Sequence, residues 1–179
     1  VTIVNTTDEL LDKVTELVLN HFRKVPVLVV TQGKEKDELN KVYGKILGQL
    51  PHGVRREHVQ RLRERDDDGK LLGSEWEKVV KDATRRTGTG DNSYYYITVT
   101  DKFGGRGHDF NCRDEKANNN KGMLVIATSI PDEREWIQWK GRTARQDRPG
   151  QFYVVLSEKG APFDEPKHKK LLAKIKDRG

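Results

Sequence analysis

The chain has 179 residues, of which 34% are hydrophobic and 35% are charged, and its 34 Lys and Arg exceed its 28 Asp and Glu by a formal charge of +6. This length suits one domain with an ordinary buried core, and several dense apolar runs exclude disorder over the whole chain. The single cysteine, Cys112, excludes an internal disulfide framework and a Cys-based zinc site, and it fits a reducing compartment such as the cytoplasm. No apolar stretch reaches the roughly 20 residues that span a bilayer, and the polar start at Val1, without an initiator Met, predicts an excised fragment.

The first third of the sequence predicts a helix, a strand and a second helix. A Thr-Asp pair at positions 7–8 suits a helix cap, and apolar residues then follow at helical spacing up to Phe22. Residues 26–31 form a short apolar run rich in β-branched side chains, which is typical of a strand covered on both faces. A second helix is expected over about residues 36–47.

Residues 51–73 contain few apolar anchors, although 58–62 favours an edge strand. The aspartate run at 66–68 has two interpretations. Carboxylates bind divalent cations, but an acidic turn before Gly69 is the commoner role. A helix is predicted over 74–86.

Three further strands are expected at residues 94–100, 123–128 and 151–156. Helices alternate with the predicted strands, so the connections should be crossovers. The expected fold class is therefore α/β, with a mainly parallel sheet, helices on both faces and ligands at the carboxyl ends of the strands. The asparagine run at 118–120 is expected in a surface loop.

Positive charge is concentrated at the end of the chain, since residues 140–179 contain eleven Lys and Arg against five Asp and Glu. Such a segment attracts phosphates, nucleic acid or an acidic membrane surface, but a solvated Lys-rich helix is more common. Residues 160–179 are thus expected to form a basic terminal helix or tail of the single domain 1–179. Leu171, Leu172 and Ile175 have the spacing of a docked helix.

Arginines at helical spacing form the strongest candidate site. Residues 131–133 open a helix with Pro and two acids, and Gln138, Arg142 and Arg145 then share one face of it. Gly141 removes a side chain beside them. Paired guanidiniums suit a polyphosphate because each donates two parallel hydrogen bonds and stays charged. The alternative is that both arginines only pair with carboxylates of a neighbouring element.

This segment resembles the QxxGRxxR motif VI of superfamily 2 helicases and translocases, and its continuation over 146–153 resembles the translocation ATPase SecA. Upstream, the run 105–109 resembles the GRGTD of SecA motif V, with His108 in place of Thr, and it also follows a predicted strand. Residues 26–31 and 35–39 resemble motif IV. The resemblance is strong over 95–157, moderate over 8–48 and nearly absent over 49–90.

The resemblance implies the second, C-terminal RecA-like domain of an ATP-driven motor and a role for each matching residue. Arg145 would be the arginine finger on the γ-phosphate and Arg142 a second phosphate contact. Asp109 would contact the nucleotide or its ribose, and Gln138 would couple the two domains across the cleft. The turn made by Gly105, Arg106 and Gly107 would let backbone approach a ligand or the facing domain, with Arg106 bracing the loop.

The sequence contains neither a GxxxxGK[ST] phosphate loop nor an apolar strand ending in a DEAD-like acidic pair. ATP and Mg²⁺ are therefore expected to be bound mainly by an N-terminal ATP-binding RecA-like domain, and this chain alone should be inactive. The match to SecA favours unfolded polypeptide as cargo, in a cytoplasmic protein that attaches peripherally to a membrane. A nucleic-acid helicase is the first alternative, and an interaction module that has lost its motor is the second.

Overall fold

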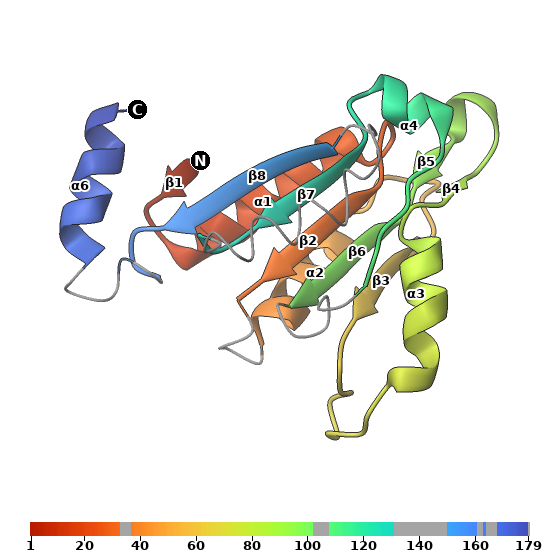
Figure 1. Cartoon of the computed structure of the whole chain (residues 1–179), viewed down its shortest axis with the longest axis horizontal. Coiled ribbons are helices and arrows are strands. Elements are labelled where there is room, and N and C mark those ends of the chain that lie inside the picture. Colours follow the sequence, from red (N-terminus) through yellow and green to blue (C-terminus); the bar gives the residue numbers. More distant parts are fainter. Residues whose placement is uncertain (33–36, 102–107, 131–149, 161–162, 164–167, 179) are drawn as a thin grey trace.

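A six-stranded parallel β-sheet organises the chain in the computed structural model (Figure 1). The structure describes residues 1–32, 37–101, 108–130, 150–160, 163 and 168–178. The strands, in chain order, are β1 (Thr2–Val4), β2 (Val27–Thr31), β3 (Val59–Leu62), β6 (Ile97–Asp101), β7 (Met123–Ala127) and β8 (Gly150–Ser157). They lie side by side in the order β1-β8-β7-β2-β6-β3, and every pairing in this sheet is parallel.

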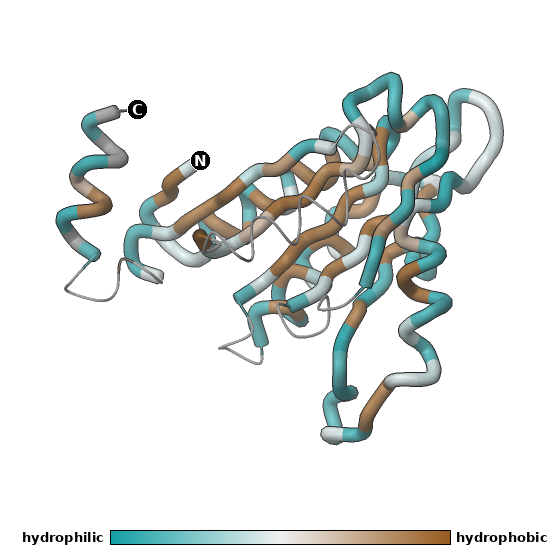
Figure 2. Tube along the Cα trace, in the orientation of Figure 1, coloured by the Kyte–Doolittle hydropathy of each residue, from teal (hydrophilic) through white to brown (hydrophobic). Residues whose placement is uncertain are grey.

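The central strands form where continuous apolar runs were predicted. All five residues of β2 and all five of β7 are buried, as expected for strands covered on both faces. Figure 2 shows these strands as hydrophobic tubes inside a more polar periphery. β3 lies at the end of the sheet, which confirms the predicted edge strand.

The register defines two edges of the sheet. Thr31 pairs with Asp101 at the end of β6, and Val30 pairs with Ala127 at the end of β7. The last residues of β6, β2 and β7 therefore lie together at what we term the carboxyl edge. We term the opposite edge, where Val27 pairs with Ile97 and Leu124, the amino edge.

Helices cover both faces of the sheet, as predicted. α1 (Thr7–His21) packs against β8, and α2 (Glu38–Gly48) packs against β6, β3 and α1. Both lie behind the sheet in Figure 1, whereas α3 (Trp76–Asp82) lies on the near side beside β3. Short 3₁₀ turns occupy Arg56–His58, Gly73–Glu75 and Gly90–Asn92. The α/β class, the parallel sheet and the two helical layers are thus confirmed.

The core joins the sheet to the helices behind it. Phe22 at the end of α1, Leu28 in β2 and Ile46 in α2 belong to one buried cluster and are almost inaccessible to water. Burying one such side chain contributes about 1.5–3 kcal/mol. The amphipathic stripe that predicted α1 therefore also determines which side of that helix faces the sheet.

Several local predictions were wrong. The side chain that caps α1 is Thr6, whose hydroxyl accepts from the backbone N–H of Glu9 at 3.1 Å. The predicted strand at 94–100 is two strands, because β5 (Tyr94–Tyr95) pairs antiparallel with β4 (Arg86–Thr87) before β6 begins. The asparagine run 118–120 was expected in a loop. Its first two residues instead end the short helix α4 (Glu115–Asn119), and Asn120 is the C-cap of that helix. β1 was not predicted.

The basic end of the chain contains α6 (Lys169–Arg178). Leu172 packs against a small apolar cluster that contains Phe163 and Ile3, whereas Leu171 is exposed. Leu172 is thus one point at which the terminal helix contacts the apolar cluster beside the sheet. No helix within the described residues is long and apolar enough to cross a membrane.

Candidate functional site

Most residues of the predicted site lie outside the part of the chain that the structure describes. Gln138, Gly141, Arg142 and Arg145 fall within 131–149, and Gly105, Arg106 and Gly107 fall within 102–107. Asp109 is the member of the predicted set that the structure places. The described residues nevertheless determine between which strand ends each motif segment lies.

Both motif segments begin next to the same strand. Residues 102–107 follow β6, and residues 131–149 connect β7 to β8. β6 and β7 are the two neighbours of β2, so their carboxyl ends lie two strand spacings apart, or about 10 Å. β8, which follows the second segment, begins at Gly150, and this residue pairs with Met123 at the amino edge.

The winding of the chain reverses at this place. From β2 the chain passes β6 to reach β3, and from β6 it passes β2 to reach β7. Adjacent strands whose connections leave in opposite directions create a crevice at the carboxyl edge, and ligands of open α/β sheets bind in such crevices. The crevice predicted by this rule lies at the carboxyl end of β2, between the two strands that precede the motif segments.

Polar side chains connect the strand ends at this edge. The Oγ1 of Thr128 donates to Oε1 of Glu38 at 2.6 Å, and the backbone N–H of Gln32 donates to the other carboxylate oxygen, Oε2, at 3.3 Å. The side-chain amide of Gln32 donates to the backbone carbonyl of Thr128 at 3.2 Å. We call these three residues the β2–β7 clamp, since together they connect the end of β2, the start of α2 and the end of β7.

Buried threonines continue the connection across β6 and β3. The hydroxyl of Thr31 donates to the carbonyl of Thr100 at 3.1 Å, and that of Thr100 donates to the carbonyl of Leu62 at 2.7 Å. Both threonines are fully buried, so these bonds satisfy hydroxyls that water does not reach. Sequence reasoning missed this network, although the polar residues that end two apolar runs, Thr31-Gln32 and Thr128, were a signal for it.

Asp109 lies in the extended segment that leads from the carboxyl edge back toward α4. Its side chain is exposed. Its neighbours are anchored: Phe110 is buried in the core, and the ring of His108 lies edge-on to Trp76 with centroids 5.7 Å apart. The backbone on both sides of Asp109 is thus held while the carboxylate faces outward, in agreement with a ligand contact or a surface turn.

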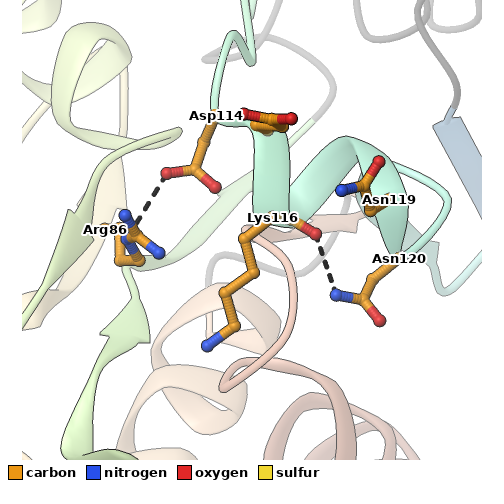
Figure 3. Close-up of a pocket in the computed structure, with 6 residues that line it drawn as sticks. Arg86, Asp114, Lys116, Asn119 and Asn120 are labelled. Atoms are coloured by element: carbon orange, nitrogen blue, oxygen red, sulfur yellow. Dashed lines mark hydrogen bonds and ion pairs between the residues drawn. The ribbon is translucent and has the colours of Figure 1, made fainter. Parts of the chain in front are cut away.

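A hollow of about 500 Å³ lies away from the predicted site (Figure 3). It is lined by Arg86, Asp114, Glu115, Lys116, Asn119 and Asn120. α4 precedes β7, and Arg86 pairs with Tyr95 just before β6, so the hollow is at the amino edge. Its lining mixes both charges, and Nε of Arg86 already lies 3.4 Å from Oδ2 of Asp114. We assign these contacts a structural role rather than a role in ligand binding, because they connect β4 and β5 to α4.

Asp114 is the centre of these contacts. Its Oδ1 accepts from the Tyr95 hydroxyl at 2.5 Å and from the backbone N–H of Ala117 at 3.0 Å, which caps α4. Burial alone would raise the pKa of Asp114, but these hydrogen bonds and the charge of Arg86 outweigh burial and lower it. Burial, followed by the hydrogen bond and the charge of Asp114, raises the pKa of the Tyr95 phenol well above its usual range. The carboxylate is therefore ionised and the phenol neutral at physiological pH.

His58 forms a second polar cluster at the amino edge. Its Nδ1 lies 2.7 Å from the Tyr94 hydroxyl, which also accepts from the backbone N–H of Arg55 at 3.1 Å. The imidazole is flanked by the rings of Tyr94 and Tyr96, with centroids 5.5 and 4.9 Å away. Burial is the main reason why the pKa of His58 is lowered. Neutral His58 thus helps to hold β3 against β5.

The aspartate run forms a turn, as its commoner interpretation predicted. Oδ1 of Asp66 accepts from the backbone N–H groups of Asp68 and Lys70 at 2.9 and 2.8 Å. Asp67 pairs with Arg63 at 2.9 Å. Among the described residues, no three His, Cys, Asp or Glu side chains are placed to hold a metal ion.

Comparisons with known proteins give a likeness of fold. No protein-family model and no curated protein matches the sequence. Among solved structures, the Hef helicase domain of Pyrococcus furiosus superposes with a TM-score of 0.49 at 16% identity, over 86% of this chain and 26% of that one. The chain thus spans about a quarter of the length of that structure. This likeness of fold does not bear on SecA, so that part of the resemblance stays a prediction.

Proposed function

We propose that this chain is the second, C-terminal RecA-like half of an ATP-driven motor and contributes Arg142 and Arg145 to an ATP site completed by another domain. The observation that carries the proposal is topological. The two segments with motor-like sequences follow β6 and β7, and both strands adjoin β2 where the winding reverses. A nucleotide site is expected at that place in an open α/β sheet.

The chemistry follows from the residue types. Two guanidiniums neutralise charge on the transferred phosphoryl group without being consumed, and an arginine finger acts once the cleft between two motor domains closes. Mg²⁺, bound by the partner domain, would supply the remaining charge neutralisation at the phosphates. Exposed Asp109 lies close after β6, where it is suited to accept a hydrogen bond from a ribose hydroxyl.

The proposed cargo is unfolded polypeptide, as in SecA-type protein translocation. This proposal rests on the sequence run 146–153 and on 105–109, which resemble SecA more than they resemble a nucleic-acid helicase. A helicase is the alternative, because the same ATPase core drives both kinds of cargo. Stimulation of the assembled ATPase by unfolded polypeptide, but not by single-stranded nucleic acid, would distinguish the two.

The test uses this chain together with its ATP-binding domain. Arg145→Ala should leave nucleotide binding largely intact and lower turnover by ~10³-fold or more, as loss of an arginine finger does in other phosphoryl-transfer proteins. Arg142→Ala should weaken both binding and turnover. Arg56→Ala is the matched control, since Arg56 is exposed and precedes β3 at the amino edge. It should change neither quantity.

Two results would contradict the proposal. Turnover of about one per second by the chain alone, surviving further purification, would refute a half-site, because that rate is in the ordinary range for complete enzymes. If Arg145→Ala instead unfolds the domain, the arginines only pair with neighbouring carboxylates and have a structural role. Normal turnover in Arg145→Ala would favour an interaction module that has lost its motor function.

A further inference from the structure

We infer that Glu38 is a positioning residue for the proposed ATPase, because its carboxylate fixes the carboxyl end of β7 against the end of β2 and the start of α2. The inference rests on the proposed function and gives a role to a residue of the 35–39 run, for which the resemblance implied none. The proposed role of Glu38 is indirect. It acts through the strand ends at which the connections to the proposed site begin.

The contacts that carry the inference involve both carboxylate oxygens. Oε1 accepts from the buried hydroxyl of Thr128 at 2.6 Å, and Oε2 accepts from the backbone N–H of Gln32 at 3.3 Å. Gln32 completes the clamp through its side-chain amide, which donates to the carbonyl of Thr128 at 3.2 Å. Two of these three hydrogen bonds join residues 90 and 96 positions apart in sequence, and the third joins Gln32 to Glu38.

The backbone hydrogen bonds show what the clamp supports. The N–H of Thr128 donates to the carbonyl of Val30 at 3.1 Å, which extends the β2–β7 pairing one residue beyond β7. Two residues later, at exposed Ile130, the described part of this connection ends. The clamp is therefore the last set of described contacts before the segment with the arginines. A shift of about 1 Å at a site of phosphoryl transfer lowers the rate by up to ~10²-fold.

A carboxylate suits both partners, because each of its oxygens accepts a charge-assisted hydrogen bond. Glutamine at position 38 has one acceptor oxygen, so accepting from the N–H of Gln32 would turn its NH₂ group toward the Thr128 hydroxyl, which would then have to accept instead of donate. Glu38→Gln therefore removes the charge from the clamp and reverses or breaks one of its hydrogen bonds, with almost no change in volume. At position 128, Val removes the hydroxyl at constant shape, whereas Ser keeps it.

A simpler role for Glu38 is stabilisation of α2, since an acidic residue in the first helical turn interacts favourably with the helix dipole. The chain contains a matched control for that role. Glu9 lies in the first turn of α1, and its Oε2 accepts from the backbone N–H of Asn5 at 3.0 Å. Glu9 has the same chemistry in an exposed place that is not joined to β7.

The experiment measures steady-state ATPase activity of the chain assembled with its ATP-binding domain. Glu38→Gln and Thr128→Val should each lower kcat by ~10-fold to ~100-fold while KM for ATP changes by less than about threefold. Thr128→Ser should retain most activity, and Glu9→Gln should leave both parameters unchanged. Equal losses in Glu9→Gln and Glu38→Gln would overturn the inference, since helix stabilisation would then account for them.

Amide hydrogen exchange, measured on the chain alone, tests the clamp independently of ATPase activity. Glu38→Gln and Thr128→Val should speed exchange in a peptide that covers 127–130, and Glu9→Gln should not. Faster exchange with unchanged kcat would show a clamp without a catalytic role and would overturn the inference. The Arg145→Ala result separates the two proposals: if that variant is inactive while Glu38→Gln is normal, this inference alone fails, and if Arg145→Ala is fully active, the proposed function fails as well.

Discussion

Replacing Tyr95 by Phe should destabilise the fold by about 1.5–3 kcal/mol, the usual contribution of a hydrogen bond to a charged group. The ring is fully buried and stays so in the variant, so the change removes only the hydroxyl. That hydroxyl donates to Asp114 at 2.5 Å, and the Asp114 side chain is only 20% exposed. Asp114 keeps its bond from Ala117 and its contact with Arg86, which excludes the larger cost of an unpaired buried charge.

The assay is urea unfolding of the chain at pH 7, analysed as a double-mutant cycle with Asp114→Asn. The coupling energy between Tyr95 and Asp114 should exceed about 1 kcal/mol, because contacting groups in one network are not additive. Tyr43→Phe is the control. The Tyr43 ring packs under the Arg61 guanidinium at 4.4 Å, but its hydroxyl makes no hydrogen bond within the described residues. Its loss should cost no more than about 0.5 kcal/mol.

The same pair predicts how stability depends on pH. The pKa of Asp114 is lower in the folded chain than the ordinary value of 3.8, so its ionised form contributes stability that is complete above that value. This contribution is lost as the pH falls through the lowered folded pKa. The difference between wild type and Tyr95→Phe should therefore shrink below about pH 4. A coupling energy below about 0.5 kcal/mol, or equal losses in Tyr95→Phe and Tyr43→Phe, would refute the reasoning.

Two further predictions concern charge. The pKa of His58 is lowered, chiefly by burial, so its contribution to stability is complete above the ordinary value of 6.5 and decreases as the pH falls from 6.5 toward the folded pKa. His58→Gln should flatten the pH dependence of the unfolding free energy between pH 5 and 7, and an unchanged slope would contradict this assignment. The chain should bind single-stranded nucleic acid weakly. Its affinity should fall steeply as salt is added, because only counterion release drives the contact. Trp139 follows Gln138 in the run that resembles motif VI. Tight binding at physiological salt that weakens in Trp139→Ala would favour base stacking and a helicase.

The sequence by itself determined the elements whose signal is local. β2 and β7 are continuous apolar runs, and a strand buried on both faces needs no other information to be recognised. The stripe of α1 likewise comes from side chains three and four positions apart. Alternation of such elements was enough to predict a parallel sheet with crossover helices. The motif segments were found in the same way, because they are short runs of specific residues.

The order of the strands and the contacts between them required the tertiary structure. β1 has only three residues, and it becomes a strand by pairing with β8 about 150 positions away. The aromatic run at 94–100 divides because its backbone changes partners: Tyr95 donates to the carbonyl of Phe22, and Tyr96 donates to that of Arg85. The polar residues of the β2–β7 clamp are visible in the sequence, but their pairing is not. Its bonds depend on which strand ends become neighbours, and that is decided by how the whole sheet buries its apolar faces rather than by any local pattern.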